Sequence, residues 1–435
     1  MDFQIFSVKR VNGGVRNIMI NHLANIKKLF LIGLAVASSK VVLLLFAYFF
    51  DAETYNQFNQ VYYTASMVIL FGSLGFNIAV TKIKLGMKWV VLTVGLTTVV
   101  SYIFLQILSS PFENVFQIIS ILVYCIFSSL GGIYVFQVLF SGRYTDYVLL
   151  TLLYSLLHLL IIPSLLLLKL SLFSVLPFVS FLWFVIGLSK YIPQREESIS
   201  VLKEFWKIGI SAFVINSAVS LALAADKYFV NHFFSTDLAN SYTFAWGITA
   251  PMFYIGVLIE QYLFSETNTS KPNILKRGFI FSSSLVIFYA IGVLSVVHFF
   301  PALIPPSVDY ESVVKISLLM ISGYSVYIIF HFPVNAYLFK SLSTGKQKTI
   351  SIAFSVIISV YLVIYILILQ EIILINYLWL LIITWSYIFT LLITKILIMF
   401  REELDKEPVK SFVEIKNLVS QRLISLRLKH LTKKH

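Results

Sequence analysis

Charge is scarce in this sequence. Only 12% of its 435 residues are Asp, Glu, Lys or Arg, whereas 59% are hydrophobic. A soluble domain is about 25% charged and about 45–50% apolar, and a globule of this length would lack the polar side chains that its surface needs. The composition therefore excludes a soluble enzyme and a disordered chain, and it indicates an integral membrane protein.

Cysteine and the common catalytic motifs are also nearly absent. Cys125 is the single cysteine and lies in an apolar run, so an internal disulfide and a secreted disulfide scaffold are excluded. Gly345-Lys346 is followed by Gln347, not by Ser or Thr, so there is no Walker A motif. HExxH, CxxC and GxSxG do not occur. We therefore expect a transporter and not an enzyme, with no cofactor and no metal, and with coupling to H+ or Na+ left open.

Long hydrophobic runs are what the sequence has in abundance. Twelve runs are long enough to cross a hydrocarbon core of about 30 Å, and all are predicted helices because an open sheet edge would leave backbone groups unpaired in lipid. The first run starts too far into the chain, and is too long, for a cleavable signal. The runs cover residues 29–50, 60–80, 89–108, 115–140, 147–168, 172–188, 208–228, 241–264, 278–300, 313–339, 350–369 and 372–400.

The runs divide the chain into two equal sets. Six runs precede the longest connection, residues 189–207, and six follow it. Because each half crosses the membrane an even number of times, both halves have the same orientation, which permits a parallel repeat about an axis normal to the membrane. We expect an all-α polytopic membrane protein of about twelve transmembrane helices in two six-helix lobes. Its parts are a cytoplasmic segment 1–28, an N-terminal lobe 29–189, a cytoplasmic linker 190–207, a C-terminal lobe 208–400 and a basic tail 401–435. The tail has apolar residues at helical spacing and is predicted to lie on the inner leaflet; a solvated tail is the alternative.

The basic residues indicate the orientation. With a cytoplasmic N-terminus, 29 of the 33 Lys and Arg residues fall in segments on the cytoplasmic side, as the positive-inside rule requires. Acidic residues such as Asp51, Asp237 and Asp309 then fall in the outer turns. We predict that both termini are cytoplasmic. The net charge of +13 is therefore a topology signal, and no nucleic-acid partner is expected.

Several stretches carry a resemblance to a known family. Phe50-Asp-Ala-Glu-Thr-Tyr-Asn-Gln-Phe58, followed by Phe71-Gly-Ser-Leu-Gly-Phe-Asn-Ile-Ala-Val-Thr-Lys82, resembles the first hairpin of polysaccharide flippases of the O-antigen type. Val135-Phe-Gln-Val-Leu-Phe-Ser-Gly-Arg143 and Ala225-Asp-Lys-Tyr-Phe229 with Asn240-Ser-Tyr-Thr-Phe-Ala245 also fit. The resemblance covers about residues 25–400. The chain departs from the family at Phe264-Ser-Glu266, where a proline often closes the eighth helix.

The resemblance implies a function. Members of this family belong to the multidrug, oligosaccharidyl-lipid and polysaccharide exporter superfamily. They move undecaprenyl-pyrophosphate-linked oligosaccharides, such as the repeat units of O-antigen in lipopolysaccharide, across the bacterial inner membrane by alternating access. The implied partners are this lipid-linked glycan, membrane lipids and the polysaccharide polymerase and chain-length machinery. The implied location is the bacterial inner (cytoplasmic) membrane.

Lys40 is the sharpest single feature, because it lies in the middle of the first predicted span beside Ser38 and Ser39. A cation at mid-bilayer costs about 2.5–3.5 kcal/mol on insertion scales, so such residues usually face a wet cavity or a partner. We expect its ammonium to meet the pyrophosphate of the lipid carrier as a point charge. A structural ion pair, or a span shifted along the sequence, is the alternative.

Polar residues on three further spans complete the predicted cavity. Hydroxyl and amide groups on one helix face suit sugar recognition, although interhelical hydrogen bonds explain small polar residues equally well. Asp226-Lys227 is predicted to be either a local charge pair at the membrane interface or an external gate or substrate contact. Glu260 is predicted to be either an interfacial residue or a proton carrier. The predicted cavity residues beside Lys40 are Ser66, Ser73, Asn77, Asn216, Ser220, Asp226, Lys227, Thr249 and Glu260.

Three other functions compete with a flippase. A drug or small-solute antiporter of the same superfamily would favour acidic residues at mid-depth, and Lys40 argues against it. A membrane-embedded polysaccharide polymerase or glycosyltransferase would need a large external loop, whereas the longest connection, 189–207, is short and lies on the predicted cytoplasmic side. A non-transporting scaffold would not explain a lysine in mid-membrane.

Overall fold

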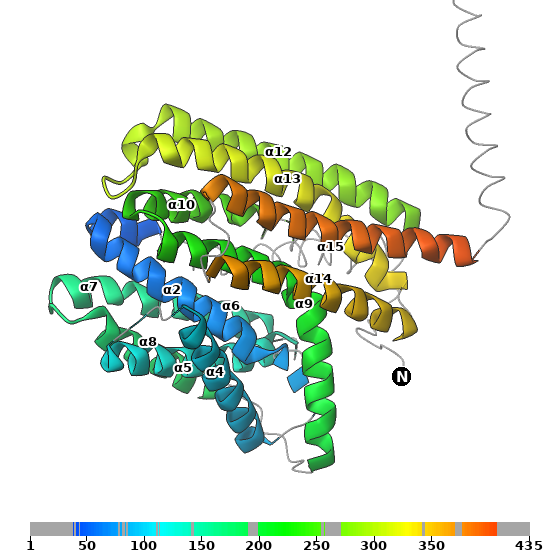
Figure 1. Cartoon of the computed structure of the whole chain (residues 1–435), viewed down its shortest axis with the longest axis horizontal. Helices are drawn as coiled ribbons and strands as arrows, with labels where there is room; N and C mark the ends of the chain where they lie inside the picture. The colour runs from blue at the N-terminus through cyan, green and yellow to red at the C-terminus, as the bar shows by residue number, and fades with distance from the viewer. Residues whose placement is uncertain are drawn as a thin grey trace, which may run out of the picture.

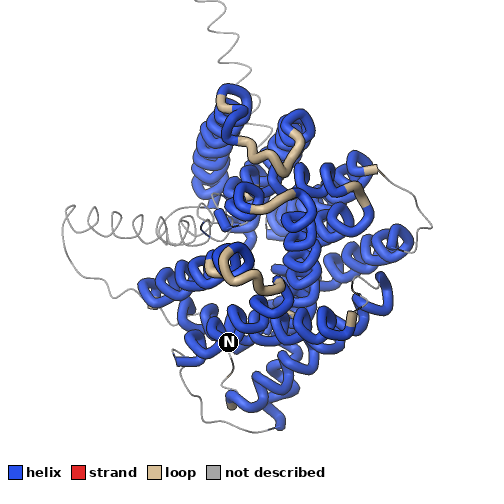
Figure 2. The backbone as a smooth tube through the Cα atoms, turned by 90° about the vertical axis from the view of Figure 1, so that its left-hand side faces the viewer, coloured by secondary structure: helices blue, strands red, loops and turns tan. Residues whose placement is uncertain are grey.

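The chain is helical throughout the part that its structure describes. The computed structural model describes residues 38, 41–42, 44–76, 79–80, 83, 86–109, 112, 114–140, 143–189, 199–253, 256, 271–341, 344–369 and 376–406. These residues form helices and short connections, with no strand among them (Figure 2). The predicted all-α, polytopic membrane fold is confirmed.

Eight helices in these ranges are long and apolar enough to cross a membrane: residues 87–109, 115–135, 145–166, 172–189, 275–299, 310–335, 349–368 and 377–400. The remaining predicted spans correspond to residues 41–50 and to helices α2, α9 and α10, which carry more polar side chains or continue beyond the described ranges. The polar residues of these helices bear on the candidate site.

The first group of helices comes from the N-terminal half. We call it the N-terminal bundle, and it contains α2 (Ala52–Ser73), α4 (Met87–Ser109), α5 (Val115–Phe140), α6 (Tyr144–Leu159), α7 (Ile161–Leu166) and α8 (Leu172–Ser189). Its helices pack closely on one another, α5 against α8 most extensively. The connection between α7 and α8 is as short as the sequence indicates.

Helix α2 differs from the predicted span 60–80. It begins earlier because Asp51 caps it, with the Asp51 Oδ1 accepting a hydrogen bond of 2.8 Å from the Thr54 backbone N–H. It ends at Ser73, because Leu74 and Gly75 take positive φ values of 37° and 69°. The helix that carries Ser66 and Ser73 therefore ends before position 77.

The second group forms the C-terminal bundle. It contains α9 (Ile199–Phe233), α10 (Thr236–Thr249), α12 (Lys271–Phe299), α13 (Tyr310–Ser341), α14 (Thr344–Leu369) and α15 (Tyr377–Lys406). Helix α9 begins inside the predicted linker 190–207, and its first turns pack against the N-terminal bundle, where the Phe205 ring stacks on Phe76 with centroids 5.0 Å apart. The long helix α9 thus contacts both bundles.

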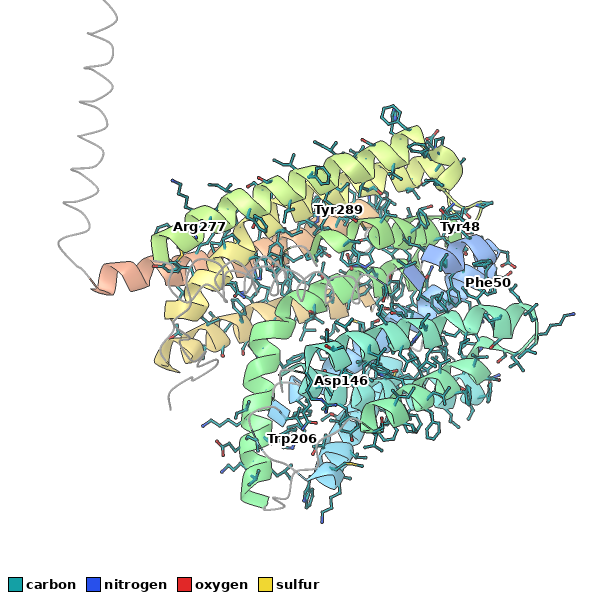
Figure 3. The ribbon with its side chains drawn as sticks, turned by 180° about the vertical axis from the view of Figure 1, so that it is seen from behind. Tyr48, Phe50, Asp146, Trp206, Arg277 and Tyr289 are labelled. Atoms are coloured by element: carbon teal, nitrogen blue, oxygen red, sulfur yellow. The ribbon has the colours of Figure 1, made fainter. Side chains whose placement is uncertain are left out.

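The two bundles meet mainly along α2. Helix α2 packs against both α9 and α10, and Figure 1 shows this meeting at the left, from which the ribbons of α4 and α14 diverge toward the right. Tyr48 and Phe50 lie at the end where the bundles meet, and Arg277 lies at the opposite end (Figure 3). A connection between the bundles at one end is therefore the feature that positions the candidate site.

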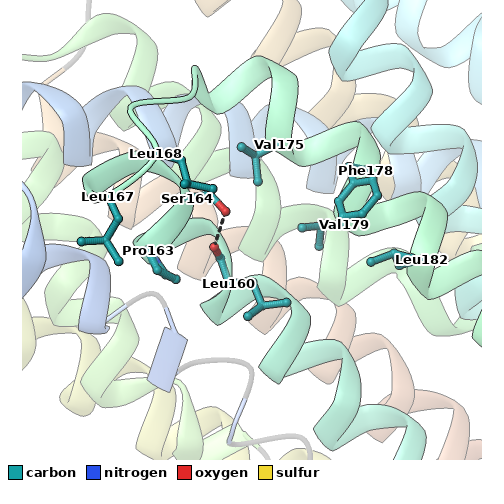
Figure 4. A pocket seen from close by; sticks show the side chains of 9 residues that line it. All are labelled: Leu160, Pro163, Ser164, Leu167, Leu168, Val175, Phe178, Val179 and Leu182. Atoms are coloured by element: carbon teal, nitrogen blue, oxygen red, sulfur yellow. Dashed lines mark hydrogen bonds between the residues drawn. The ribbon is translucent and has the colours of Figure 1, made fainter.

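The outer face of the bundles is apolar, as a lipid-facing surface requires. Large hydrophobic side chains such as Leu92, Phe104, Phe288 and Val356 are exposed. A shallow hollow of about 300 Å³ lies between the end of α6, α7 and α8 (Figure 4). Its one polar lining residue, Ser164, donates its hydroxyl to the Leu160 carbonyl oxygen at 2.8 Å, so the hollow presents hydrocarbon to the surrounding lipid.

Candidate functional site

A layer of polar side chains joins the two bundles where α2 meets α9 and α10. The Thr64 hydroxyl and the His232 Nε2 atom are 2.9 Å apart, and the Gln60 amide donates to the Asn231 carbonyl oxygen at 2.9 Å. The Asn59 amide donates to the Asn240 Oδ1 atom at 3.4 Å. We call these six residues, Asn59, Gln60, Thr64, Asn231, His232 and Asn240, the interbundle latch.

Further hydrogen bonds reinforce the latch at the same end of the molecule. The Asn240 amide also donates to the Ala52 carbonyl oxygen at 2.8 Å, and the Ser307 hydroxyl donates to the Ala47 carbonyl oxygen at 2.6 Å. The hydroxyls of Ser109 and Tyr228 share a further contact between α4 and α9. In the ranges that the structure describes, these bonds lie near the turns that contain Asp51 and Asp309, and no carboxylate, lysine or arginine takes part in them.

Directly beside the latch, α9 carries a buried ion pair. Asp226 and Lys227 are 0% and 1% exposed, and the Lys227 Nζ atom lies 2.7 Å from the Asp226 Oδ1 atom. The same carboxylate oxygen accepts the Lys227 backbone N–H at 2.7 Å. The ammonium also donates to the Leu223 carbonyl oxygen of the preceding turn.

Two neighbouring helices complete the surroundings of this pair. The Tyr242 hydroxyl of α10 donates to the Asp226 Oδ2 atom at 2.7 Å, and the Tyr324 hydroxyl of α13 approaches it at 3.5 Å. The Lys227 ammonium lies 3.6 Å from the centroid of the Trp246 ring, within the range of a cation–π interaction. The predicted charge pair between Asp226 and Lys227 is present, but it is buried inside the C-terminal bundle, because α9 continues to Phe233. Its depth in the membrane, at the interface or not, stays a prediction.

A second buried cation lies elsewhere in the C-terminal bundle. Lys395 of α15 is 4% exposed, and its ammonium donates to the Asn335 Oδ1 atom at 2.8 Å and lies 5.6 Å from the centroid of the Phe354 ring. Lys395 is one of the 29 basic residues that the sequence assigns to the cytoplasmic side, but packing places its side chain among α13, α14 and α15 and not on an exposed surface.

Three predicted cavity residues satisfy their hydroxyl donors within their own helices. Ser66 donates to the Tyr62 carbonyl oxygen at 2.8 Å and Ser73 to that of Leu70 at 3.2 Å. Thr249 donates to the Ala245 carbonyl oxygen at 2.9 Å and is fully buried against Met320 of α13. Ser66 and Ser73 are partly buried, and Thr249 packs inside the C-terminal bundle.

For most of the other predicted cavity residues, the structure describes either no position or only the helix to which the residue belongs. Lys40, Asn77 and Glu260 lie outside the described residues. Asn216 belongs to α9, and Ser220 is exposed on the same helix. The prediction that these residues line one substrate cavity is therefore not tested by the described residues.

Sequence reasoning missed most of the latch. None of its six residues is among the predicted cavity residues, and only Asn240 lies in a stretch that carries the family resemblance. The available signal was the density of amide side chains at the end of α9 and the start of α2, two places where a lipid-facing helix would be apolar. Among the described residues, no group of three or more His, Cys, Asp or Glu side chains is placed to hold a metal ion.

Two carboxylates in the turns at the latch end serve as helix caps. The Thr54 backbone N–H holds the pKa of Asp51 below its ordinary value of 3.8. The Ser312 hydroxyl and backbone N–H act on Asp309 in the same way and lower its pKa. The Ser241 hydroxyl also accepts the Asp309 backbone N–H at 3.0 Å, so this turn is fixed to the start of α10.

Comparison with known proteins gives a structural likeness and no sequence match. No protein-family model and no curated protein matches the chain. A solved multidrug-resistance MATE family transporter of the MOP superfamily, in an inward-facing conformation, aligns with a TM-score of 0.52 and 14% identity, covering 87% of this chain and 95% of that one. A MOP superfamily transporter from Pyrococcus furiosus aligns with a TM-score of 0.48 and 11% identity, over 88% and 95% of the two chains. On the first of these alignments, the chain has the fold of a MATE-type transporter of the MOP superfamily.

Proposed function

We propose that this protein is a transporter that works by alternating access, and that it flips an undecaprenyl-pyrophosphate-linked oligosaccharide across the bacterial inner membrane. The observation that carries the proposal is the interbundle latch, because neutral hydrogen bonds hold two helix bundles together at one end of a MATE-type fold. Each hydrogen bond of this kind makes a net contribution of about 0.5–1.5 kcal/mol to stability. Such a connection can break and re-form when the bundles rock.

The orientation that the sequence predicts assigns the latch to the outer side. The turns of Asp51 and Asp309 are predicted to be external, so the described conformation is closed outward. A lipid-linked substrate would then enter from the inner leaflet, with its head group between the bundles and its polyprenyl chain in the lipid. Opening the latch would release the head group on the outer side.

The charges inside the protein support an anionic head group. The fully buried charged side chains among the described residues are Asp226, Lys227 and Lys395, so buried lysines outnumber buried carboxylates there. Lys40 adds a further cation within the first predicted span. A pyrophosphate fits such an interior better than a cationic drug does.

A drug or small-solute antiporter is the second candidate, favoured by the fold shared with a multidrug-resistance transporter. A cationic drug requires an available carboxylate. Asp226 does not offer one, since the Lys227 ammonium and the Tyr242 hydroxyl already bind its two oxygens. This occupancy makes the antiporter the weaker proposal.

Reconstitution separates the two candidates. The full-length protein would be placed in liposomes with fluorescent undecaprenyl-pyrophosphate-linked oligosaccharide, and head-group movement would be followed by accessibility to a membrane-impermeant glycosidase. We expect flipping by the wild-type protein and its loss in Lys40→Ala. Lys169→Ala is the matched control, because Lys169 is an exposed lysine in the α7–α8 turn.

Other outcomes of the same experiment would contradict the flippase proposal or the role of Lys40. Efflux of a cationic dye under an H+ or Na+ gradient, without glycan movement, would favour the antiporter. Full flipping by a stably produced Lys40→Ala variant would remove Lys40 from the mechanism. Normal flipping by Lys169→Ala is needed to attribute any loss to the position of Lys40 within its predicted span.

A further inference from the structure

The surroundings of Asp226 form a shell of oxygen atoms from three helices. Helix α9 supplies the carboxylate and the Leu223 carbonyl oxygen, α10 supplies the Tyr242 hydroxyl, and α13 supplies the Tyr324 hydroxyl. All four residues are at least partly buried, and Asp226, Tyr242 and Tyr324 almost completely so. Carboxylate, carbonyl and hydroxyl oxygens are the ligands that hard cations prefer.

The ammonium of Lys227 occupies this shell through an unusual path. Neighbouring residues on a helix point about 100° apart, and side chains at i and i+1 do not normally face each other. The Lys227 side chain nevertheless curls back so that Nζ contacts the Asp226 Oδ1 atom at 2.7 Å and the Leu223 carbonyl oxygen one turn earlier. The Trp246 ring covers the ammonium at 3.6 Å. A carboxylate, a carbonyl and an aromatic face are also the contacts that a free monovalent cation would take.

We propose that the shell around Asp226 is a monovalent-cation site and that Lys227 is its permanent, covalently attached occupant. The wild-type site therefore needs neither Na+ nor K+. Removing the ammonium leaves a position flanked by the Asp226 Oδ1 atom, the Leu223 carbonyl oxygen and the Trp246 ring. An isolated buried carboxylate has to acquire a cation or a proton. A free alkali cation then enters the vacated position.

The proposal requires more than a local charge pair. A charge pair alone needs only the two charged groups, whereas a cation site needs neutral oxygens that remain after one charge is deleted. The Leu223 carbonyl oxygen contacts the ammonium directly, whereas the Tyr242 hydroxyl holds the other oxygen of the carboxylate, Asp226 Oδ2. This part of the bundle therefore keeps its oxygen shell when Lys227 is replaced.

The test compares thermal unfolding of purified full-length variants in different salts. Lys227→Met keeps the length of the side chain and removes its charge. Its melting temperature should rise with the logarithm of NaCl or KCl concentration, measured against choline chloride at equal ionic strength. The wild-type protein and the double variant Asp226→Asn/Lys227→Met should give the same melting temperature in all three salts. Because the readout is stability, it is independent of whether the protein flips a glycan.

Two results would overturn the proposal. One is a Lys227→Met variant whose stability is indifferent to alkali cations and rises only as the pH falls, since a proton would then be neutralising Asp226. The other concerns the wild-type protein and does not depend on how well Lys227→Met folds. It is a sodium-specific stabilisation of the wild type that the double variant lacks, because an alkali cation would then bind beside the lysine and not in place of it.

Discussion

At the scale of single residues, Asp226 depends on the hydroxyl groups that solvate its second oxygen. Water cannot reach this carboxylate, so Tyr242 and Tyr324 take its place. The two phenols differ in geometry: Tyr242 donates at 2.7 Å, whereas Tyr324 lies at 3.5 Å, the limit of a hydrogen bond. This difference provides a controlled comparison within one site.

Tyr242→Phe is expected to reduce the stability of the protein by about 1.5–3 kcal/mol, the usual worth of a hydrogen bond to a charged group. Tyr324→Phe keeps its ring packing and loses only the long contact, so we expect a loss under about 1 kcal/mol. Unfolding of both variants in detergent micelles measures the difference. Equal losses of stability in the two variants would show that the hydrogen bond from Tyr242 is no stronger than the contact from Tyr324.

The sequence could predict that Asp226 and Lys227 matter, but not where they lie. A hydropathy window marks the end of an apolar run, and that end assigned the pair to the membrane interface. Its burial depends on Tyr242 of the next helix, α10, and on Tyr324 of α13, 98 positions further along the chain. Lys395 shows the same limitation, since only the packing of α13, α14 and α15 removes it from the cytoplasmic surface.

At the scale of helices, close approach between α2 and α4 depends on a glycine. A Cβ atom at Gly72 would lie 2.8 Å from the Thr98 Cα atom and 2.5 Å from its hydroxyl oxygen. Thr97 also donates its hydroxyl to the Gly72 carbonyl oxygen. The absence of a side chain is therefore what lets α4 lie against α2.

Gly72→Ala is expected to destabilise the protein by about 1–3 kcal/mol, because overpacking forces the backbone of α4 away. Gly95→Ala is the matched control in the same bundle, since nothing lies within 4 Å of its Cβ position. That change should be neutral or stabilising by up to about 1 kcal/mol. If both variants unfolded at the same temperature, the contact at Thr98 would not limit the approach of the two helices.

The cap of α2 predicts an acid-dependent loss of stability. The pKa of Asp51 is lower in the folded protein than its ordinary value, so the ionised cap stabilises the fold above that value. This contribution is lost as the pH falls through the lowered pKa. Asp51→Asn keeps a capping side chain without the titration, and it should lose less stability than the wild type between about pH 5 and about pH 3.

Asp51→Ala completes this comparison. It removes the cap altogether and should be about 1 kcal/mol less stable than Asp51→Asn at every pH. Melting temperatures measured over the same pH range test all three proteins together. Parallel curves for the wild type and Asp51→Asn would mean that other groups, such as Asp309, account for the acid sensitivity.

The helices themselves were largely predictable, and their ends were less so. Apolar runs identify a helix in lipid because backbone groups must pair internally. The first turns of α9 contain Lys203, Glu204 and Lys207, so a hydropathy pattern starts this helix too late. The break after Ser73 depends on the left-handed residues Leu74 and Gly75, which hydropathy does not register.

At the scale of the whole molecule, the latch makes the outward closure testable. Thr64 and His232 come from different bundles, and their side chains are in contact. In a Cys125→Ala background, cross-linking Thr64→Cys/His232→Cys with a short, reducible bifunctional thiol reagent should stop glycan flipping, and a reducing agent should restore it. The reason is that a covalent bond prevents the bundles from separating at this end.

The control for this experiment is a cysteine pair beside the latch whose two residues both belong to the C-terminal bundle. Asn231→Cys/Thr243→Cys joins α9 to α10, whose side chains already contact each other at 3.1 Å. Its cross-linking should leave flipping unchanged, because these two helices move together. Undiminished flipping by the cross-linked Thr64→Cys/His232→Cys protein would contradict the proposal that the two bundles separate at the latch.

The latch could not have been predicted as a unit. Gln60 and Asn231 are separated by 171 positions, and Asn59 and Asn240 by 181. Each residue alone fits the ordinary role of a polar group between membrane helices. Only the packing of α2 against α9 and α10 brings them into one layer.

The chemistry of the latch also determines how it responds to voltage. A membrane potential does about 2.3 kcal/mol of electrical work per elementary charge for each 100 mV, and the latch contains no carboxylate, lysine or arginine. The neighbouring Asp226 and Lys227 would move together as a neutral pair. With His232 as the neutral imidazole, opening and closing the latch carries no formal charge of its own through the electric field. Any voltage dependence of the cycle then has to come from what the protein carries.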